Sequence, residues 1–216
     1  MTCCSTFSSE ARQQFTAARA ARDLARYGRK GADVTTRMLR DLVMEATPAG
    51  ATLLDIGAGV GVLTFELLRA GFHRAIAVDA SGAYAAAGRE ETARRGLEGL
   101  VDWREGDFVA LAPELPAADV VTLDRVVCCY PSWRDLLTSA CDRAGREVAC
   151  SYPRDRAIVR AVVAAENVVR RLRGTAFRTF VHPPSAMRAL VERRGFRLAG
   201  QRATFAWRAD VFLRST

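Results

Sequence analysis

The sequence predicts a single α/β domain in which helices cover both faces of a mostly parallel sheet. From residue 52 onward, short apolar runs rich in β-branched residues alternate with helical segments, which is the pattern of consecutive strand–helix units. The chain ends in two strand-like runs with no helix between them, which favours a reversed, antiparallel C-terminal strand. With 216 residues, half of them apolar, the chain has enough material for one domain with a sizeable core.

Residues 1–49 are expected to form an N-terminal helical cap. The segment that begins at Ser9, a potential N-cap, places apolar residues at helical spacing between arginines. The stretch YGRKGAD interrupts this pattern. A second helix is expected from about residue 34 to 46, because Pro48 then ends the helical pattern.

Residues 50–216 are expected to contain the sheet. Between the strands lie helical patterns at 61–70, 83–95 and 132–143. Ligands of such sheets bind at the carboxyl ends of the strands, near the point where the strand order reverses. The strand-like runs are TLLDI (52–56), AIAVD (75–79), LVDWRE (100–105), DVVTLD (119–124) and EVACSY (147–152).

A lid-like insertion is expected at about residues 154–185. It opens with a long amphipathic segment, RDRAIVRAVVAAENVVRRLRG (154–174), and continues through FVHPPS. A short helix to Arg194 and a hairpin of FRLAGQRAT and FAWRADVFLR complete the chain. One face of the amphipathic segment carries Ile158, Val162, Ala165, Val169 and Leu172.

The loop after the first strand predicts a nucleotide-binding site. It contains Asp55 followed by glycines at alternate positions, Gly57, Gly59 and Gly61. A dinucleotide fold requires G-x-G-x-x-G, but Val62 occupies the third glycine position. The carboxylate of Asp55 would repel a pyrophosphate and attract an ammonium or sulfonium group. S-adenosylmethionine carries both of these cations.

Two further acids follow the next strands. Asp79 ends the second strand, where a carboxylate can accept hydrogen bonds from both hydroxyls of a ribose. Asp107 and Phe108 follow the third strand, where an acid beside an aromatic ring can bind an adenine. Either acid alone would more often be a helix cap. Three such features in order along the sheet indicate a cofactor site.

These residues resemble the successive motifs of class I S-adenosylmethionine-dependent methyltransferases, a Rossmann-like fold. The motifs are LLDIGAGVGVLTFELLRAG, AVDASGAY, GDF and DVVTLDRVVCCYP, within residues 50–153. A weaker resemblance, through Y-x-x-K-G and D-R-V-x-C-C-Y-P, is to bacterial relatives of magnesium-protoporphyrin O-methyltransferase. That subfamily usually has His-Tyr-Pro where this chain has Cys129-Tyr130-Pro131.

The resemblance implies S-adenosylmethionine as cofactor and methyl transfer as the activity. It implies that the glycine loop lines the methionine part, that Asp79 holds the ribose, and that Asp107 with Phe108 holds the adenine. Asp124 and Arg125 stand where the family places substrate-facing residues. The residues expected at the cofactor are Asp55, Gly57, Ala58, Gly59, Gly61, Asp79, Ala80, Asp107, Phe108, Asp124 and Arg125.

Three side chains are candidates for catalysis. Methyl transfer needs mainly alignment of the nucleophile and exclusion of water, and a general base only when the nucleophile begins as a hydroxyl or ammonium. Tyr27 could fold over the cofactor, and Tyr130 follows the fourth strand on the ligand side. His182 lies in the loop after the amphipathic segment. The N-terminal cap, the Tyr130 loop, Tyr152 and the His182 loop are expected to form the acceptor pocket together.

The charge and cysteine content leave the acceptor open. The net charge is +8, carried almost entirely by arginine, and it fits a solvated surface or an acceptor that carries carboxylates. The cysteines form no C-x-x-C pair, so no zinc site is expected. No apolar run is long enough for stable membrane insertion and no export signal is evident, so we expect a cytoplasmic protein. The sequence does not indicate an oligomeric state.

Small or medium-sized organic molecules are the expected acceptors. RNA is the alternative, since six arginines between residues 154 and 173 could follow a phosphate backbone. Those arginines could equally form the solvent-exposed face of an amphipathic helix. The motifs of enzymes that methylate nucleic-acid amino groups or cytosine are absent after the fourth strand. A non-catalytic scaffold of the same fold is the other alternative. A scaffold has no need for a complete set of cofactor residues.

Overall fold

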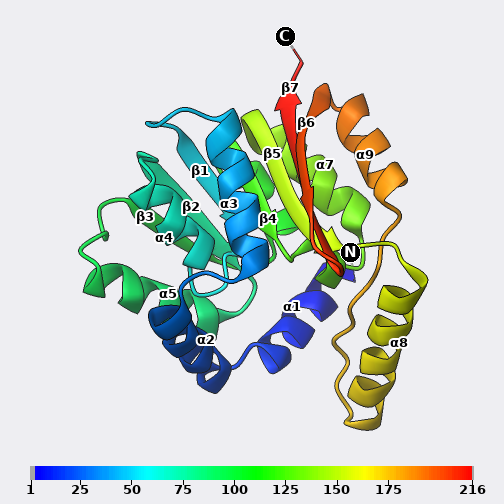
Figure 1. Ribbon diagram of the computed structural model, residues 1–216. Coiled ribbons are helices and arrows are strands. Elements are labelled where there is room, and N and C mark those ends of the chain that lie inside the picture. The colour runs from blue at the N-terminus through cyan, green and yellow to red at the C-terminus, as the bar shows by residue number, and fades with distance from the viewer. Residues whose placement is uncertain (1–2, 216) are drawn as a thin grey trace.

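The computed structural model, which describes residues 3–215, contains a seven-stranded sheet with the order β3-β2-β1-β4-β5-β7-β6 (Figure 1). Strands β1 to β5 are parallel, and β7 runs antiparallel to both β5 and β6. The predicted parallel sheet and reversed C-terminal strand are therefore confirmed. The strands are β1 (Thr52–Ile56), β2 (Arg74–Asp79), β3 (Val101–Glu105), β4 (Ala118–Asp124), β5 (Ala144–Pro153), β6 (Phe196–Ala203) and β7 (Trp207–Arg214).

Helices cover the sheet on both faces (Figure 1). Consecutive strand residues point to opposite faces, so Leu53 packs in one hydrophobic cluster and Leu54 in the other. This double burial explains the nearly continuous apolar runs of the central strands β1, β2 and β4. One face carries α3 (Val34–Ala46), α4 (Val62–Arg69) and α5 (Gly82–Arg94); the other carries α6 (Phe108–Leu111), α7 (Trp133–Arg143) and α9 (Pro184–Arg193).

Two N-terminal helices, α1 (Cys3–Gln14) and α2 (Ala17–Lys30), lie at the carboxyl ends of the strands. Ser81, just beyond β2, donates a hydrogen bond from Oγ to the carbonyl of Phe15 at 2.7 Å. The expectation that Ser9 begins a helix is wrong, because α1 already begins at Cys3 and contains Ser9. The helical conformation is interrupted after Gln14. At that break the Phe15 ring makes edge contacts with Tyr84 and Phe177, which lie far away in sequence.

Helix α8 (Ala157–Leu172) stands apart from the helices that cover the sheet (Figure 1). It contacts the following segment through Asn167, whose side chain exchanges two hydrogen bonds with the backbone of Thr179. The apolar stripe recognised in the sequence of this helix faces solvent. No helix in the described part of the chain combines the length and apolarity needed to cross a bilayer.

Candidate cofactor and acceptor site

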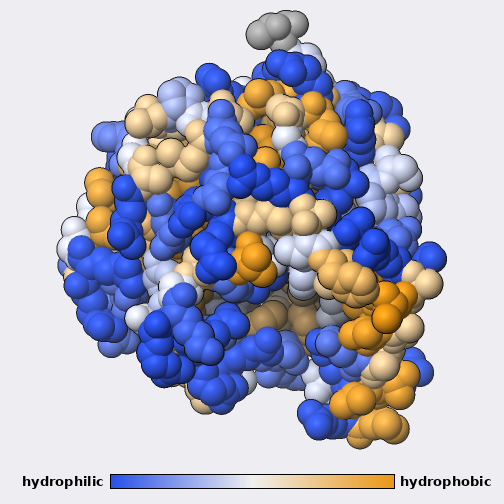
Figure 2. Space-filling model, viewed as in Figure 1, coloured by the Kyte–Doolittle hydropathy of each residue, from blue (hydrophilic) through white to orange (hydrophobic). Residues whose placement is uncertain are grey.

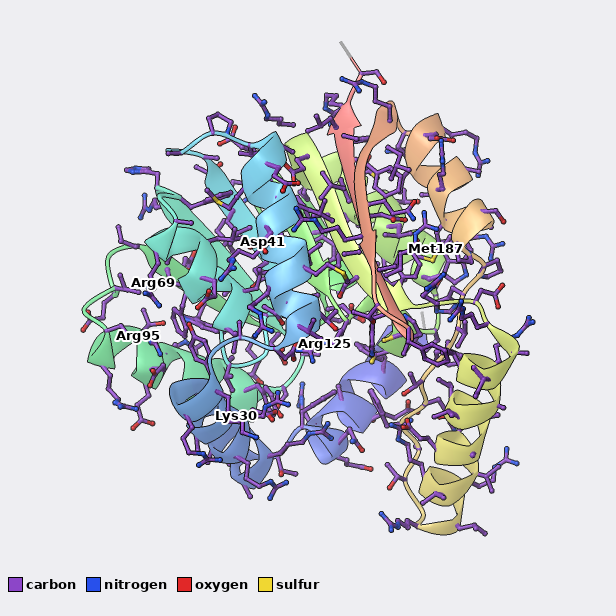
Figure 3. All side chains as sticks on the ribbon, in the orientation of Figure 1. Lys30, Asp41, Arg69, Arg95, Arg125 and Met187 are labelled. Atoms are coloured by element: carbon purple, nitrogen blue, oxygen red, sulfur yellow. The ribbon has the colours of Figure 1, made fainter. Side chains whose placement is uncertain are left out.

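A cavity of about 250 Å³ opens at the carboxyl ends of β1, β2 and β4. Its position coincides with the reversal of strand order between β1 and β4, where open α/β sheets bind their ligands. Helices α1 and α2 contribute to the opposite wall. Figure 3 shows Arg125, a lining residue, at the end of the central strands between α3 and α1.

The glycine loop forms one wall of the cavity. Gly57 and Gly59 line it with φ angles of 62° and 61°, values that side chains disfavour. A Cβ at Gly57 would lie 2.5 Å from a methyl group of Val126. Gly61 does not line the cavity, because its Cα faces Phe65, and a Cβ at this position would lie 2.9 Å from the ring. Gly61 therefore permits close packing of α4, whereas Gly57 and Gly59 keep the cavity wall free of side chains.

Two buried carboxylates lie beside this loop. Asp55 accepts hydrogen bonds from the hydroxyls of Thr64 and Thr122, both at 2.7 Å, and burial raises its pKa to about 7. Asp79 accepts the backbone N–H groups of Gly59 and Ser81 at 2.8 Å, and burial raises its pKa to about 6. Each carboxylate keeps unused lone pairs. A cation or a pair of hydroxyl donors in the cavity would offset the cost of burying their negative charge.

Acidic side chains outnumber basic ones around the cavity, although the whole chain is basic. Among the described residues that line it, the acids are Asp23, Asp33, Asp55, Asp79 and Asp124, and the bases are Arg26 and Arg125. The guanidinium of Arg125 is paired with Asp33 at 2.5 Å and lies 3.7 Å from Asp124. This balance favours a cationic ligand and disfavours a diphosphate.

Most of the residues expected at the cofactor meet at this cavity. Ala58, Ala80 and Phe108 line it together with the residues already described. Asp107 does not line it: its carboxylate accepts a hydrogen bond from Val109 N–H at 3.0 Å and one from the Tyr130 hydroxyl at 2.9 Å. Adenine could reach Asp107 only if that tyrosine hydroxyl moves.

The three catalytic candidates lie in different places. Tyr27 and Tyr130 line the cavity. The Tyr27 hydroxyl donates to Glu66 at 2.8 Å, and burial raises its pKa to about 12, so it is protonated at neutral pH. His182 does not line the cavity; its ring stacks on Phe180, and its buried Nε2 has no hydrogen-bond partner among the described residues. Burial lowers the pKa of His182, so its imidazole is neutral at pH 7.

Tyr152 also lies away from the cavity. Its hydroxyl donates to Asp210 on β7, and both side chains are buried. The expectation that Tyr152 lines the acceptor pocket is therefore wrong. The pairing of β5 with β7 turns this side chain into the core.

The N-terminal helices contribute to the cavity, but the sequence did not identify which of their acids reach it. Asp23 accepts a hydrogen bond from the Tyr84 hydroxyl at 2.7 Å, and Asp33 caps α3 while it pairs with Arg125. Cys129 also lines the cavity, with its sulfur 3.6 Å from that of Cys128. Only the helix-capping role of Asp33 has a local signal in the sequence. The other contacts join segments that are far apart in the chain.

Part of the chain is similar to known methyltransferases. Residues 53–146 match the family model described as "Methyltransferase domain". The ribosomal protein L11 methyltransferase of Sorangium cellulosum is 33% identical over 88 residues, which cover 40% of this chain and 28% of that protein. The chain thus spans less than a third of the length of this curated relative.

Solved structures extend the similarity to nearly the whole chain. Magnesium protoporphyrin IX methyltransferase from Synechocystis PCC 6803, with bound S-adenosylhomocysteine, superposes with a TM-score of 0.74 and 17% identity, covering 97% of this chain and 100% of that one. An O-methyltransferase family 2 protein from Planctomyces limnophilus, in complex with apigenin, gives a TM-score of 0.68 at 14% identity, covering 88% and 60%. At these identities the likeness is one of fold.

Proposed function

Because the chain contains a methyltransferase domain with the class I, S-adenosylmethionine-dependent fold, we propose that it transfers a methyl group from S-adenosylmethionine to a small or medium-sized organic acceptor. The observation that carries this proposal is the acidic, glycine-walled cavity at the strand-order reversal. Its charge suits a sulfonium and an ammonium. Its wall at Gly57 leaves no room for a side chain, as expected where a ligand approaches the backbone closely.

The residues of the cavity fit the cofactor part by part. The glycine loop and Asp55 would hold the methionine portion, and Asp79 would accept hydrogen bonds from the two ribose hydroxyls. Phe108 would contact the adenine, with Asp107 accessible once the Tyr130 hydroxyl turns away. When bound, S-adenosylmethionine supplies a methyl carbon that its positive sulfur has already activated.

The protein's own contribution would be alignment and exclusion of water. Residues 1–49 would act as the cap in this proposal: α1 and α2 close the cavity at the strand ends, held by the Tyr84–Asp23 hydrogen bond and the Arg125–Asp33 ion pair. Tyr27, fixed by Glu66, would cover the cofactor. It would not act as a base, because its pKa of about 12 keeps it protonated.

An apolar or aromatic acceptor suits the remaining walls of the cavity. Phe7, Phe15, Val126 and Leu136 line it with Tyr130. The partly exposed guanidiniums of Arg26 and Arg125 could bind a carboxylate on the acceptor. His182 stays a candidate base, since its neutral imidazole and unpartnered Nε2 could accept a proton if the acceptor reaches it.

The proposal is tested by incubating the protein with S-adenosylmethionine labelled in its methyl group and a panel of small metabolites, followed by mass spectrometry. Label should appear in one chemical class of acceptor, at a rate that Asp79→Asn lowers by reducing cofactor affinity. The matched control is Asp102→Asn, which alters an exposed acid on β3 that does not line the cavity. Transfer only to RNA, or no transfer by protein that binds the cofactor, would contradict the small-molecule proposal.

A further inference from the structure

Helix α8 exposes an apolar stripe that nothing in the described chain covers. The exposed fractions are 57% for Ile158, 54% for Val162 and 82% for Leu172, and Val168 and Val169 are also largely exposed. At helical spacing these residues lie on one face. Figure 2 shows apolar residues gathered over α8, whereas the surface around α2 is mostly hydrophilic. A monomeric soluble protein rarely leaves such a continuous patch unpartnered.

The opposite side of α8 explains why the stripe points outward. Val159 is buried, Asn167 is hydrogen-bonded to Thr179, and the Arg170 guanidinium donates to the Thr179 hydroxyl at 2.7 Å. These contacts fix the rotation of the helix against the following segment. The face that carries Val159, Asn167 and Arg170 is therefore the inner face, and the apolar stripe is held toward solvent. This arrangement is the reverse of a helix that packs on a core.

Basic residues border the stripe. Residues 154–173 contain six arginines against one aspartate and one glutamate, and the exposed Arg171 and Arg173 border the apolar face on its two sides. Arg156, just before the helix, stacks over the exposed ring of Phe205 at 5.0 Å. An amphipathic helix with an apolar stripe and arginine flanks is suited to the interface of an anionic bilayer.

A second copy of the chain is a poorer occupant. An antiparallel pair of α8 helices would bring Arg156 and Arg160 of one copy toward Arg171 and Arg173 of the other, and like charges would repel. The helix is about 24 Å long and about 10 Å wide. That footprint is well below the roughly 800 Å² that each partner buries in a stable complex.

We propose that α8 is a membrane-surface docking element that lies in the interface of anionic lipid bilayers. The apolar stripe enters the acyl boundary, and the flanking arginines contact lipid phosphates. Segment 175–182 connects this helix to the site, because the backbone N–H of Phe180 donates to the carbonyl of Cys128 at 2.7 Å beside the cavity. Docking through α8 thus holds the domain at the membrane without inserting a helix across it.

The test is co-sedimentation of the full chain with phosphatidylcholine vesicles that contain phosphatidylglycerol and with vesicles of phosphatidylcholine alone. The protein should partition onto the anionic vesicles, and added salt should weaken the binding. Leu172→Gln should lower the partition coefficient roughly tenfold, and Arg171→Gln roughly fivefold. Both residues are exposed, and the affinity for S-adenosylhomocysteine should stay unchanged.

Each variant has a matched control elsewhere on the surface. Leu100→Gln changes an exposed leucine before β3, and Arg104→Gln removes an arginine of β3 that, like Arg171, is exposed. Neither control should alter the partition. The proposal is overturned if the protein binds neither kind of vesicle, or if Leu172→Gln has the same partition coefficient as the Leu100→Gln control. A dimer that Leu172→Gln converts to monomer would instead identify a second copy as the occupant.

Discussion

Lowering the pH should weaken cofactor binding through the protonation of Asp79. In the ligand-free protein burial raises the pKa of this carboxyl to about 6, from an ordinary value of 3.8. Its oxygens already accept two backbone N–H groups, and the proposed ribose contacts would use the remaining lone pairs of the charged form. Binding therefore requires the anion, and protonation competes with it.

The size of the effect follows from this pKa. Through Asp79 alone, the dissociation constant should be nearly constant above pH 7, about double at pH 6 and roughly tenfold higher at pH 5, because each pH unit below the pKa removes a further factor of ten of the anion. Asp55, whose pKa is raised to about 7, adds a loss that begins near pH 7 and reaches roughly a hundredfold at pH 5. The measured affinity should thus fall by more than roughly a hundredfold between pH 8 and pH 5.

Isothermal titration with S-adenosylhomocysteine between pH 5 and pH 8 measures this dependence. In Asp79→Asn binding is weaker throughout, since one of the two loop N–H groups loses its acceptor. The slope that remains in this variant belongs to Asp55, and it should begin at lower pH because the charge of Asp79 helps to raise the pKa of Asp55. The roughly tenfold loss through Asp79 should be missing from the variant. Identical profiles for the two proteins would refute the assignment of Asp79 to the cofactor.

Three further predictions concern stability and proton transfer. Glu147 is fully buried, and burial raises its pKa from 4.5 to about 7, so its stabilising contribution is present below pH 4.5 and is lost as the pH rises through 7. Relative to the parent, Glu147→Gln should therefore gain about 3 kcal/mol of unfolding free energy between pH 4 and pH 8 in urea titrations; an unchanged difference would count against it. Gly57→Ala should lower the melting temperature and abolish binding of S-adenosylhomocysteine, because it adds about 1–2 kcal/mol of backbone strain to the clash with Val126. Adding Val126→Ala should recover only the part of the melting temperature that the steric clash had lowered. Full recovery of the melting temperature would show that backbone strain is negligible. Tyr27→Phe should leave the pH profile of methyl transfer unchanged and cost about 1 kcal/mol of stability through the lost hydrogen bond to Glu66; a lost limb of that profile would reveal an acid–base role.

The sheet was accessible from the sequence because its signals are local. The central strands β1, β2 and β4 are short, mostly apolar runs, and the acids Asp55 and Asp79 stand at or next to the ends of β1 and β2. The glycine loop was also predictable as a cofactor loop of a kind other than the dinucleotide type, because its glycine spacing departs from the dinucleotide pattern at Val62. The separate role of Gly61 was not, because it depends on the approach of Phe65 and Trp103.

The rest of the site depends on contacts between distant segments. Nothing near Asp107 in the sequence indicates that Tyr130 occupies its carboxylate, and nothing near Asp33 indicates its ion pair with Arg125. The sequence also did not indicate which way the apolar face of α8 points. Periodicity identifies an apolar stripe, but contacts with a later segment, such as the bonds between Asn167 and Thr179, decide that it faces solvent.

Competitive calorimetry tests most directly whether the cavity selects a cationic sulfur compound over a diphosphate. The protein is titrated at pH 8 with S-adenosylmethionine, S-adenosylhomocysteine and NAD. We expect both sulfur compounds to bind with one-to-one stoichiometry and NAD to give no heat and no competition. Binding of NAD at the same site, or the failure of folded protein to bind either sulfur compound, would contradict the account.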